Sequence, residues 1–387
     1  MNYRTRIASS LADVGKEQWD GLLAGQARAA GQDEVNPFLR YDFLHAMHET
    51  GCADSDSGWQ PQYLTVWDGA GKEAELVGAM PLYVKWHSYG EYVFDWAWAD
   101  AYRRHGLEYY PKLLSSIPFT PVTGSRLIAK NTEAMVALVE MVEEVRASPT
   151  VSSMHVLYPP SEQAEMLHAA GFMLRSGVQF HWENQDYANF DEFLGSLEQK
   201  KRKNIRAERR KVMEAGVTFR QLRGEQIKHE HWQFFTRCYD RTYAMHGSQP
   251  YLNLEFFERV GAAMPEHTLL VLAERAGRPI ASSLVFHTDT TLYGRYWGGL
   301  EDIPCLHFET AYYQPLEFCI AEGLKHFEGG AQGEHKMARG FLPQKTWSAH
   351  WLAHAGFADA IEQFLTREAG GINAYVDELN ERNPFKP

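Results

Sequence analysis

An order of expected secondary-structure elements that occurs twice along the chain constrains the fold more than any other sequence feature. In each half, stretches with helical spacing of apolar residues lead into aromatic and branched runs separated by glycine-containing turns, and then into a further helix and strand. No residue-by-residue repeat accompanies this order. We therefore expect an α/β (α+β) protein with two domains, residues 1–185 and 186–387, whose strands form antiparallel meanders.

Four segments give the most specific expectations about local structure. Alternation and aromatic content predict a strand over residues 91–98, and apolar spacing predicts a helix near 107–116. One long helix is predicted from Phe190 to about Ala215, and another over residues 306–322. The second of these leads into a predicted strand that ends just before a glycine-rich segment.

Composition excludes several classes of protein. The 387 residues have a net charge of −12, which disfavours a chain built around broad nucleic-acid binding but leaves room for a local basic patch. The four cysteines form no CxxC pair, which is typical of reduced thiols in a cytosolic protein. No stretch approaches the roughly 20 apolar residues that a membrane span needs. We therefore expect a cytoplasmic protein with no membrane span.

The segment GGAQGEHKMARG, residues 329–340, is the first candidate for a chemical site. Its glycines allow the backbone to approach a ligand closely, and it follows the end of a predicted strand. Glutamate and histidine transfer protons near neutral pH, whereas lysine and arginine hold phosphate or carboxylate groups. A polar surface turn is the alternative interpretation. The polar residues of the segment are Gln332, Glu334, His335, Lys336 and Arg339.

A basic run, KKRKNIRAERRK at residues 200–211, is the second candidate. Eight of its twelve residues are cationic. A solvated helix face is the usual explanation of such a run, and a surface that holds a phosphate-bearing partner is the functional one. The residues that we assign to this second possibility are Lys200, Lys201, Arg202 and Lys203.

A glycine turn before the predicted helix 306–322 is the third candidate. A strand that passes through Gly298 and Gly299 into a helix beginning near Leu306 and His307 can make an anion-binding corner. No GxGxxG or Walker A pattern occurs there, so dinucleotide or ATP binding has no support. Glu309 and Tyr313 lie one turn apart on this helix and could face the same site, although packing explains Tyr313 equally well.

Two further patterns have structural alternatives that we favour. Asp95 stands in an aromatic and acidic stretch that could line a substrate site, but a core strand with a polar end explains the stretch better. His350 and His354 have the i, i+4 spacing of zinc ligands on a helix, but no third ligand is evident, so we expect no metal site. No GxSxG motif is present, and no cysteine stands in a nucleophile motif.

Several blocks resemble the FemAB-like family, whose members carry labels of peptidoglycan biosynthesis or recognition. They include NPFLRYDFLHAMHETG, KKRKNIRAERRKV, LYGRYWGG with LHFETAYYQPLEFCIAEGL, and FEGGAQGEHKMARGF. The resemblance covers residues 36–355 and implies the GNAT acyltransferase superfamily, with two GNAT-like domains in tandem, each a mostly antiparallel twisted sheet flanked by helices. In that fold the sheet splits between its middle strands, and the acyl donor lies in the split. The donor pyrophosphate meets the helix after the fourth strand, here residues 297–308.

Taken together, these features predict an N-acyltransferase that moves an acyl group from a phosphate-bearing donor, in the first instance acyl-CoA, to a small-molecule or peptide amine. The attacking amine must lose a proton, for which Glu334 or His335 is the first choice and Glu309 the second. Gln332, Lys336, Arg339, Tyr313 and Asp95 would bind substrate. Donor phosphates would meet the glycine corner and the basic run, and no cofactor is expected to be tightly bound.

Two alternatives remain open from the sequence. The Q/R-x-x-G-x-G/A pyrophosphate signature of GNAT enzymes does not occur at the glycine turn. The wider Fem group uses aminoacyl-tRNA to modify cell-wall precursors or peptides, and the basic run would suit tRNA. The other alternative is a GNAT-like module that binds a ligand without catalysis.

Overall fold

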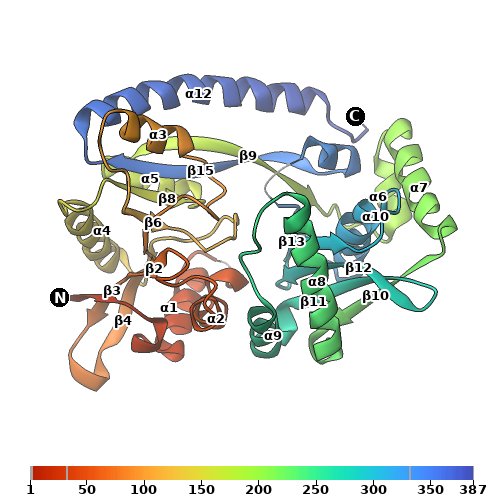
Figure 1. The fold of residues 1–387 in the computed structure, drawn as a ribbon, viewed down its shortest axis with the longest axis horizontal. Helices are drawn as coiled ribbons and strands as arrows, with labels where there is room; N and C mark the ends of the chain where they lie inside the picture. Colours follow the sequence, from red (N-terminus) through yellow and green to blue (C-terminus); the bar gives the residue numbers. More distant parts are fainter. Residues whose placement is uncertain (1–2, 32–33, 331–332, 387) are drawn as a thin grey trace. The chain divides into compact units, whose positions relative to one another are not determined.

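The computed structural model describes residues 3–31, 34–330 and 333–386, and its contacts divide the chain into two compact units (Figure 1). Unit 1 comprises Met1–Val178 with Lys345–Tyr375, and unit 2 comprises Gln179–Gln344 with Val376–Pro387. The chain therefore passes from unit 1 to unit 2, returns to unit 1 and enters unit 2 again. Three elements belong to both units: the strands β9 (Met173–Glu183) and β15 (Leu342–Leu352), and the helix α12 (Ala355–Glu381).

Unit 1 contains two groups of strands with helices packed against them. An antiparallel sheet has the order β1-β3-β4-β7, and a second group has the order β15-β8-β6-β5-β2, in which only β6 and β8 run parallel. The strands are β1 (Arg4–Ala8), β2 (Trp59–Pro61), β3 (Tyr63–Asp68), β4 (Glu75–Met80), β5 (Tyr83–Lys85), β6 (Lys112–Ser115), β7 (Ile128–Ala129) and β8 (Ser153–Leu157). The helices are α1 (Lys16–Ala29), α2 (Tyr41–Glu49), α3 (Trp96–Arg104), α4 (Thr132–Arg146) and α5 (Ser161–Ala169).

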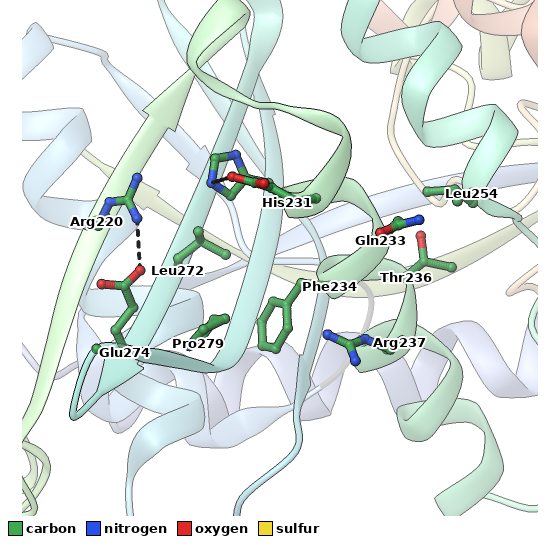
Figure 2. A pocket seen from close by; sticks show the side chains of 12 residues that line it. Arg220, His231, Gln233, Phe234, Thr236, Arg237, Leu254, Leu272, Glu274 and Pro279 are labelled. Carbon is green, nitrogen blue, oxygen red and sulfur yellow. Dashed lines mark hydrogen bonds and ion pairs between the residues drawn. The ribbon is translucent and has the colours of Figure 1, made fainter.

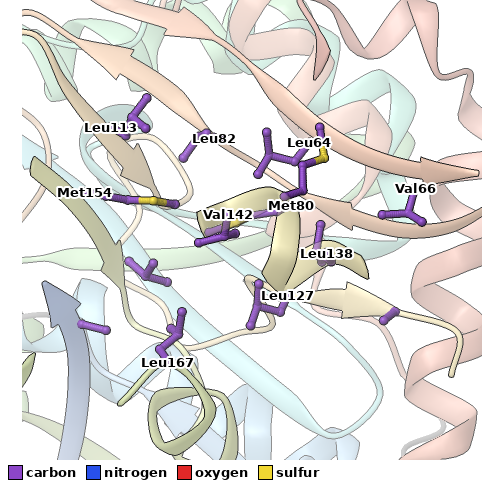
Figure 3. Packing of buried hydrophobic residues seen from close by; sticks show 14 of the residues in the cluster. Leu64, Val66, Met80, Leu82, Leu113, Leu127, Leu138, Val142, Met154 and Leu167 are labelled. Carbon is purple, nitrogen blue, oxygen red and sulfur yellow. The ribbon is translucent and has the colours of Figure 1, made fainter. Parts of the chain in front are cut away.

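The core of unit 1 lies where α4 packs on β3 and β4 (Figure 3). Leu138 and Val142 of α4 are one turn apart and both buried, as the helical period requires. They meet Leu64, Val66 and Met80, which are also buried. Each such side chain contributes roughly 1.5–3 kcal/mol by leaving water.

Unit 2 is built on one sheet with the strand order β10-β11-β12-β13-β14-β9. All neighbouring pairs are antiparallel except β13 and β14. The strands are β10 (Val217–Arg223), β11 (Thr268–Arg275), β12 (Arg278–His287), β13 (Thr291–Gly299) and β14 (His326–Glu328). The helices are α6 (Phe190–Ser196), α7 (Gln199–Glu214), α8 (His229–Met245), α9 (Leu254–Ala263), α10 (Leu306–Phe308) and α11 (Gln314–Glu322).

The predicted α/β class is confirmed, but the strand predicted over residues 91–98 is wrong. Residues 92–95 turn, with Tyr92 at φ 62°, and α3 begins at Trp96. The turn brings Glu91 and Asp95 to one ammonium group, that of Lys112. A strand would hold two residues four positions apart at roughly 13 Å from each other.

Two predicted helices also differ from the structure. The helix near 107–116 is wrong, because residues 112–115 form β6, buried on both faces and therefore without polar alternation. The single helix from Phe190 to Ala215 is broken at Leu197, which is buried in extended conformation and bridges to Phe385.

The predicted helix 306–322 is present but contains a π-turn. Residues Glu309–Tyr313 form five residues of π-helix between α10 and α11. Pro315 follows within the next turn, where its ring removes a backbone donor and clashes with the carbonyl four residues earlier. The π-turn therefore relieves that clash without ending the helix. None of the helices in the described part of the chain combines the length and the apolar surface that a bilayer crossing requires.

Candidate active site

The parallel strand pair of unit 2 separates after three residues. Thr291–Tyr293 of β13 pair with His326–Glu328 of β14. On its other edge, β13 remains paired with β12 as far as Gly299. Within the described residues, the edge of β13 beyond Tyr293 therefore has no strand partner on the β14 side. This is the sheet split that the resemblance to GNAT enzymes predicts.

A bulge in β13 accompanies the separation. Val285 pairs with Gly294 and Leu284 pairs with Tyr296, so Arg295 is the extra residue. Gly294 is needed here for space, because a Cβ at this position would lie 3.0 Å from the ring of Phe327. The bulge increases the local twist and turns the rest of β13 away from β14.

A row of polar residues crosses three strands at the same place. Glu328, the last residue of β14, pairs with Tyr293 of β13 and with His181 of β9, so the three side chains share one face of the sheet. Burial raises the pKa of Glu328 to about 8, although Arg295 opposes the shift. Within the described residues, the Oε2 atom of Glu328 is buried and has no hydrogen-bond partner.

Lys336 lies next to this row, on the 3-10 helix η7 (Glu334–Arg339). It is 2% exposed, and its ammonium donates to the carbonyl of Gly330 at 2.9 Å. Burial lowers the pKa of Lys336 to about 7. Burial also lowers the pKa of His181 to about 4, with Lys336 and His326 adding to the effect. The positive charge of Lys336 thus acts on the imidazole of His181 in the neighbouring strand β9.

His335 is an exposed imidazole on the same short helix. Its Nε2 atom lies 3.3 Å from the hydroxyl of Tyr312. Burial and the nearby Arg339 and Lys336 lower the pKa of His335, so the ring is neutral at pH 7 and able to accept a proton. Gly333, at φ 111°, makes room for this ring, because a Cβ there would lie 2.4 Å from it.

Arg339 fixes η7 to its surroundings. Its NH2 atom donates to both carboxylate oxygens of Glu208 at 2.9 Å, and its NH1 atom donates to the carbonyl of His335 at 2.6 Å. Its guanidinium also lies 3.4 Å from the ring centroid of Phe308. Tyr313 is fully buried and donates to the same Glu208. The predicted role of Arg339 and Tyr313 in substrate binding stays a prediction, and these contacts account for both residues structurally.

The two glutamates proposed as bases lie in different surroundings from His335. Glu334 is exposed and pairs with Arg382 at 3.3 Å. Glu309 is buried, and Arg209 holds it with donor distances of 2.9 to 3.2 Å, while Gln314 donates to it at 2.9 Å. The carboxylate oxygens of Glu309 are thus already occupied by hydrogen bonds from Arg209 and Gln314. Of the three predicted bases, His335 therefore has the most suitable geometry.

The glycine corner has a packing function that the sequence did not reveal. A Cβ at Gly298 would lie 2.0 Å from the carbonyl oxygen of Cys238, so this glycine allows α8 to pack directly on β13. Leu306 is a core residue whose amide donates to Ile303. His307 is mostly buried beside Trp297, with ring centroids 4.8 Å apart, and burial lowers its pKa to about 4. The contribution of Gly298, Gly299, Leu306 and His307 to donor binding stays a prediction.

The basic run forms α7, and most of its cations lie on the face away from the core. Ile205 and Val212 are its buried residues. At 100° per residue, Lys203 and Arg210 lie roughly 160° from them around the helix. Arg209 faces Glu309 and Glu317. Of the residues predicted to meet donor phosphates, Lys200 and Lys203 are exposed, whereas Lys201 and Arg202 are half-buried.

Asp95 does not lie with the other predicted site residues, because it belongs to unit 1. It is 3% exposed and accepts hydrogen bonds from Lys112 and from the hydroxyl of Tyr109 at 2.7 Å. Burial opposes its ionisation, but Lys112 and His155 outweigh that effect and hold the pKa of Asp95 below its usual value. Gln332, the remaining predicted substrate residue, lies outside the described residues.

His350 and His354 are not on a helix as the zinc spacing would require. His350 is buried on β15, where its Nδ1 atom lies 2.8 Å from the Nδ1 atom of His155. His354 lies beyond the end of that strand and is exposed. Within the described ranges of the chain, no group of three or more suitable side chains could hold a metal ion.

A separate groove of about 780 Å³ lies on unit 2 between α8 and the strands β10 to β12 (Figure 2). Phe234, Leu272 and Pro279 line it, and an ion pair of Arg220 with Glu274 at 2.9 Å spans one side. None of the residues predicted from the sequence lines this groove. We therefore place the candidate active site at the strand split and not here.

Sequence reasoning missed Glu328, His181, Tyr312 and Glu208. Glu328 is the last residue of a predicted strand, and Glu208 lies among the cations of the basic run. A useful signal was available for Glu328, since an acidic residue at a strand end directly before two glycines is unusual in a buried sheet. His181 and Tyr312 have no comparable local signal, because only strand pairing and the π-turn bring them to this place.

The sequence matches the FemAB-like family, described as peptidoglycan biosynthesis/recognition, over residues 10–387. The chain belongs to this family. A comparison with the curated proteins finds no match. Family and fold support a transferase of the GNAT/Fem type.

Solved structures share the fold at low sequence identity. FemX is 13% identical with a TM-score of 0.55, and the match covers 94% of this chain and 100% of FemX. The C-terminal domain of a putative lysylphosphatidylglycerol synthetase from Agrobacterium fabrum is 9% identical with a TM-score of 0.53, covering 91% and 96%. L-PGS from Bacillus licheniformis is 9% identical with a TM-score of 0.51, again covering 91% and 96%. These likenesses concern the fold.

Proposed function

We propose that this FemAB-like protein transfers an acyl group from a phosphate-bearing donor, in the first instance an acyl-CoA, to an amine, and that the reaction takes place in unit 2. The observation that supports the proposal best is the early separation of β13 from β14. Within the described residues it leaves β13 without a strand partner on the β14 side after Tyr293, and we place the extended part of a donor beside this segment. The family description favours a peptide or a cell-wall precursor as the acceptor.

The chemistry needs a proton acceptor but no covalent intermediate. The amine nitrogen attacks the acyl carbonyl carbon, the bond from that carbon to the donor's leaving atom breaks, and the nitrogen loses a proton. His335 takes this proton on its neutral imidazole, which Tyr312 orients through the 3.3 Å contact. The leaving group then receives a proton. Lys336 lies close enough to the strand ends to stabilise negative charge on the carbonyl oxygen during the reaction.

The first test separates donor binding from chemistry. We expect acetyl-CoA or a longer acyl-CoA to raise the melting temperature of the full chain, because it binds only the folded state. We expect His335→Gln to keep this shift and to lower acyl transfer by about 10²–10⁴-fold. His354→Gln, at an exposed histidine, is the matched control and should change neither quantity. Full transfer activity in His335→Gln would remove His335 from the mechanism.

The exposed basic face of α7 favours a second candidate, in which the donor is an aminoacyl-tRNA. Lys200, Lys203, Arg210 and Lys211 are exposed. Lys203 lies roughly 140° around the helix from Glu208, which faces η7. A small donor in the strand split would therefore not reach these cations, whereas a large polyanion could contact them and the split together.

Salt dependence distinguishes the two donors. For a tRNA donor we expect affinity to fall steeply with salt, and the slope to become shallower when Lys200, Lys203 and Arg210 are changed to Gln. Changing the exposed cations Arg28, Lys130 and Lys325 to Gln is the matched control. If neither an acyl-CoA nor a charged tRNA binds at low salt, the transferase proposal fails and a non-catalytic binding module is favoured.

A further inference from the structure

We propose that Glu328 binds the ammonium group of the acceptor and takes its first proton, so that the acceptor is a cationic primary amine and not an alcohol or an anion. This inference rests on the proposed function. It concerns a residue at the end of β14, where β13 begins to separate.

Glu328 lies at the end of β14, where the chain leaves the sheet toward η7. It is two residues before Gly330, whose carbonyl accepts from Lys336 at 2.9 Å. A Cβ at Gly330 would lie 3.4 Å from the carbonyl oxygen of Gly294, so the strand ends remain close at this point. An amine held by Glu328 would therefore lie at the point where β13 separates from β14, next to the segment where we place the donor.

Glu328 is half-buried, with a buried Oε2 atom, and it differs from the buried glutamates Glu309 and Glu91 in its hydrogen-bond partners. Glu309 has a guanidinium and an amide in direct contact, and Glu91 accepts from the ammonium of Lys112 at 2.8 Å. Within the described part of the chain, Glu328 has no ion pair within 4 Å, and its Oε2 atom has no hydrogen-bond donor. A buried acceptor atom without a donor costs free energy unless a ligand supplies one.

An ammonium group supplies the positive charge and the hydrogen-bond donor that Glu328 lacks. It carries one positive charge and three N–H donors, which match a carboxylate and neighbouring oxygen atoms. The charged groups around Glu328 are Arg295 on β13, His181 on β9 and Lys336 on η7. Of these, His181 is neutral at pH 7, because burial holds its pKa near 4. The ionised form of Glu328 attracts a cationic ligand here, and because its pKa is raised to about 8 this form gains population as the ligand binds.

The reaction needs two proton acceptors, and the site provides two. An amine arrives as R–NH₃⁺ and must lose one proton to expose its lone pair. We assign this proton to the carboxylate of Glu328. After the nitrogen attacks, the N–H that becomes surplus passes to His335. Glu328 returns its proton to solvent, and the leaving group receives the proton from His335, so the atoms and charges balance.

Burial makes the first transfer feasible. Burial lowers the pKa of the Lys336 ammonium to about 7 and raises the pKa of the Glu328 carboxyl to about 8. A ligand ammonium in the same surroundings loses hydration as Lys336 does, while its pairing with the carboxylate stabilises both charges. Because burial disfavours both charged forms, moving the proton from ammonium to carboxylate costs less free energy here than for the same two groups in water.

The test uses n-butylammonium chloride as the probe on the full chain, with tetramethylammonium chloride as the salt control that has no N–H donor. We expect butylammonium to raise the melting temperature of the wild type, and Glu328→Gln to weaken its binding by about tenfold or more. In protein with ¹³C-labelled glutamate carboxyls, the signal lost in Glu328→Gln should titrate at lower pH when butylammonium is present. Glu183→Gln, an exposed glutamate two residues from His181, is the matched control and should bind as the wild type does.

The outcomes separate this inference from the proposed function. Equal butylammonium binding in wild type and Glu328→Gln overturns the inference, and so does a Glu328→Gln variant that also loses acyl-CoA binding or melts far below the wild type. Loss of butylammonium binding with acyl-CoA binding retained supports it. If no donor binds to any variant while butylammonium still requires Glu328, the transferase proposal fails and the ammonium site stands.

Discussion

Each unit contains one parallel strand pair, and the two pairs differ in the chain segment that comes after the first strand of each. In unit 1, Leu113–Ser115 of β6 pair with Met154–Val156 of β8, and in unit 2 Thr291–Tyr293 pair with His326–Glu328. Both pairs are three residues long. After β6, residues 116–131 intervene before α4 begins, whereas only residues 300–305 separate β13 from α10.

The longer connection in unit 1 occupies the space beside its strand pair. Arg126 is fully buried and donates to the carbonyls of Leu157 at 2.9 Å, Gly124 at 2.8 Å and Val122 at 2.9 Å. The amide of Gly124 also donates to the carbonyl of Tyr158 at 3.1 Å. Residues 122–126 are thus hydrogen-bonded to the end of β8 and to Tyr158. This segment of the chain occupies the space beside the strand pair that a ligand would need.

The helices that follow the two strand pairs also differ, in whether a side chain caps their first turn. The side chain of Asn131 accepts from the amide of Ala134 at 2.8 Å and caps α4. The residue before α10 is Cys305, in left-handed conformation, and it gives no side-chain cap. A capped helix start has fewer free amides for a phosphate group. These differences favour donor binding in unit 2 and a structural role for unit 1.

Lys112 of unit 1 and Lys336 of unit 2 show the same contrast in charge, although a third buried lysine, Lys85 of unit 1, also has its pKa lowered by burial, to about 6. Lys112 of unit 1 donates to Ser88 and Glu91 at 2.8 Å each and to Asp95, and these carboxylates outweigh burial and hold its pKa above the usual value. Lys336 of unit 2 donates to a single carbonyl, and burial lowers its pKa to about 7. A compensated buried charge stabilises a fold, whereas an uncompensated one is retained at a cost in stability and is typical of a functional site.

The largest expected effect is that of Lys112→Met. It leaves the carboxylate of Asp95 buried without its cation and leaves Glu91 only the more distant Lys85, at 4.0 Å, which costs about 3–5 kcal/mol of unfolding free energy. Urea denaturation followed by circular dichroism measures the loss. Lys130→Met, which breaks the exposed pair with Glu75, is the control and should cost about 1 kcal/mol or less. A similar small loss for both variants would contradict the assignment of Lys112 as a structural cation.

A smaller effect is expected from Arg126→Met. It leaves the carbonyls of Leu157, Gly124 and Val122 without their donor, at a cost of about 2–3 kcal/mol. Hydrogen exchange should become faster over residues 117–127 before the rest of unit 1 is affected. Arg28→Met, at an exposed arginine, should leave exchange unchanged. Unaltered protection of residues 117–127 in Arg126→Met would show that this segment does not depend on Arg126.

The smallest effect concerns the pH dependence due to Lys336. Its pKa is about 7 in the folded protein and 10.5 in the unfolded chain, so between these values the unfolded chain binds more protons. Burying Lys336 therefore costs no unfolding free energy above pH 10.5. The cost grows as the pH is lowered and reaches its full value below pH 7. The unfolding free energy of the wild type should therefore rise, relative to that of Lys336→Met, by roughly 1 kcal/mol per pH unit from pH 7.5 to 9.

Lys112 provides the reference for this measurement. Its folded pKa lies above the unfolded value, so the difference between wild type and Lys112→Met should remain constant from pH 7.5 to 9. Parallel stability curves for wild type and Lys336→Met would mean that Lys336 is not buried as an uncompensated amine.

The sequence by itself determined the α/β class and most of its elements, because periodicity and glycine placement are local properties. Local patterns also selected His335 and Lys336 as candidates; in the structure His335 contacts Tyr312 and Lys336 donates to the carbonyl of Gly330, two residues after β14 ends. They did not identify Glu328 as unpaired or Asp95 as paired, since a carboxylate's surroundings depend on residues far away in the chain. Strand pairing, the turn at Tyr92 and the π-turn before Pro315 are tertiary outcomes. Burial and pairing then decided which charged residues stabilise unit 1 and which remain available for chemistry in unit 2.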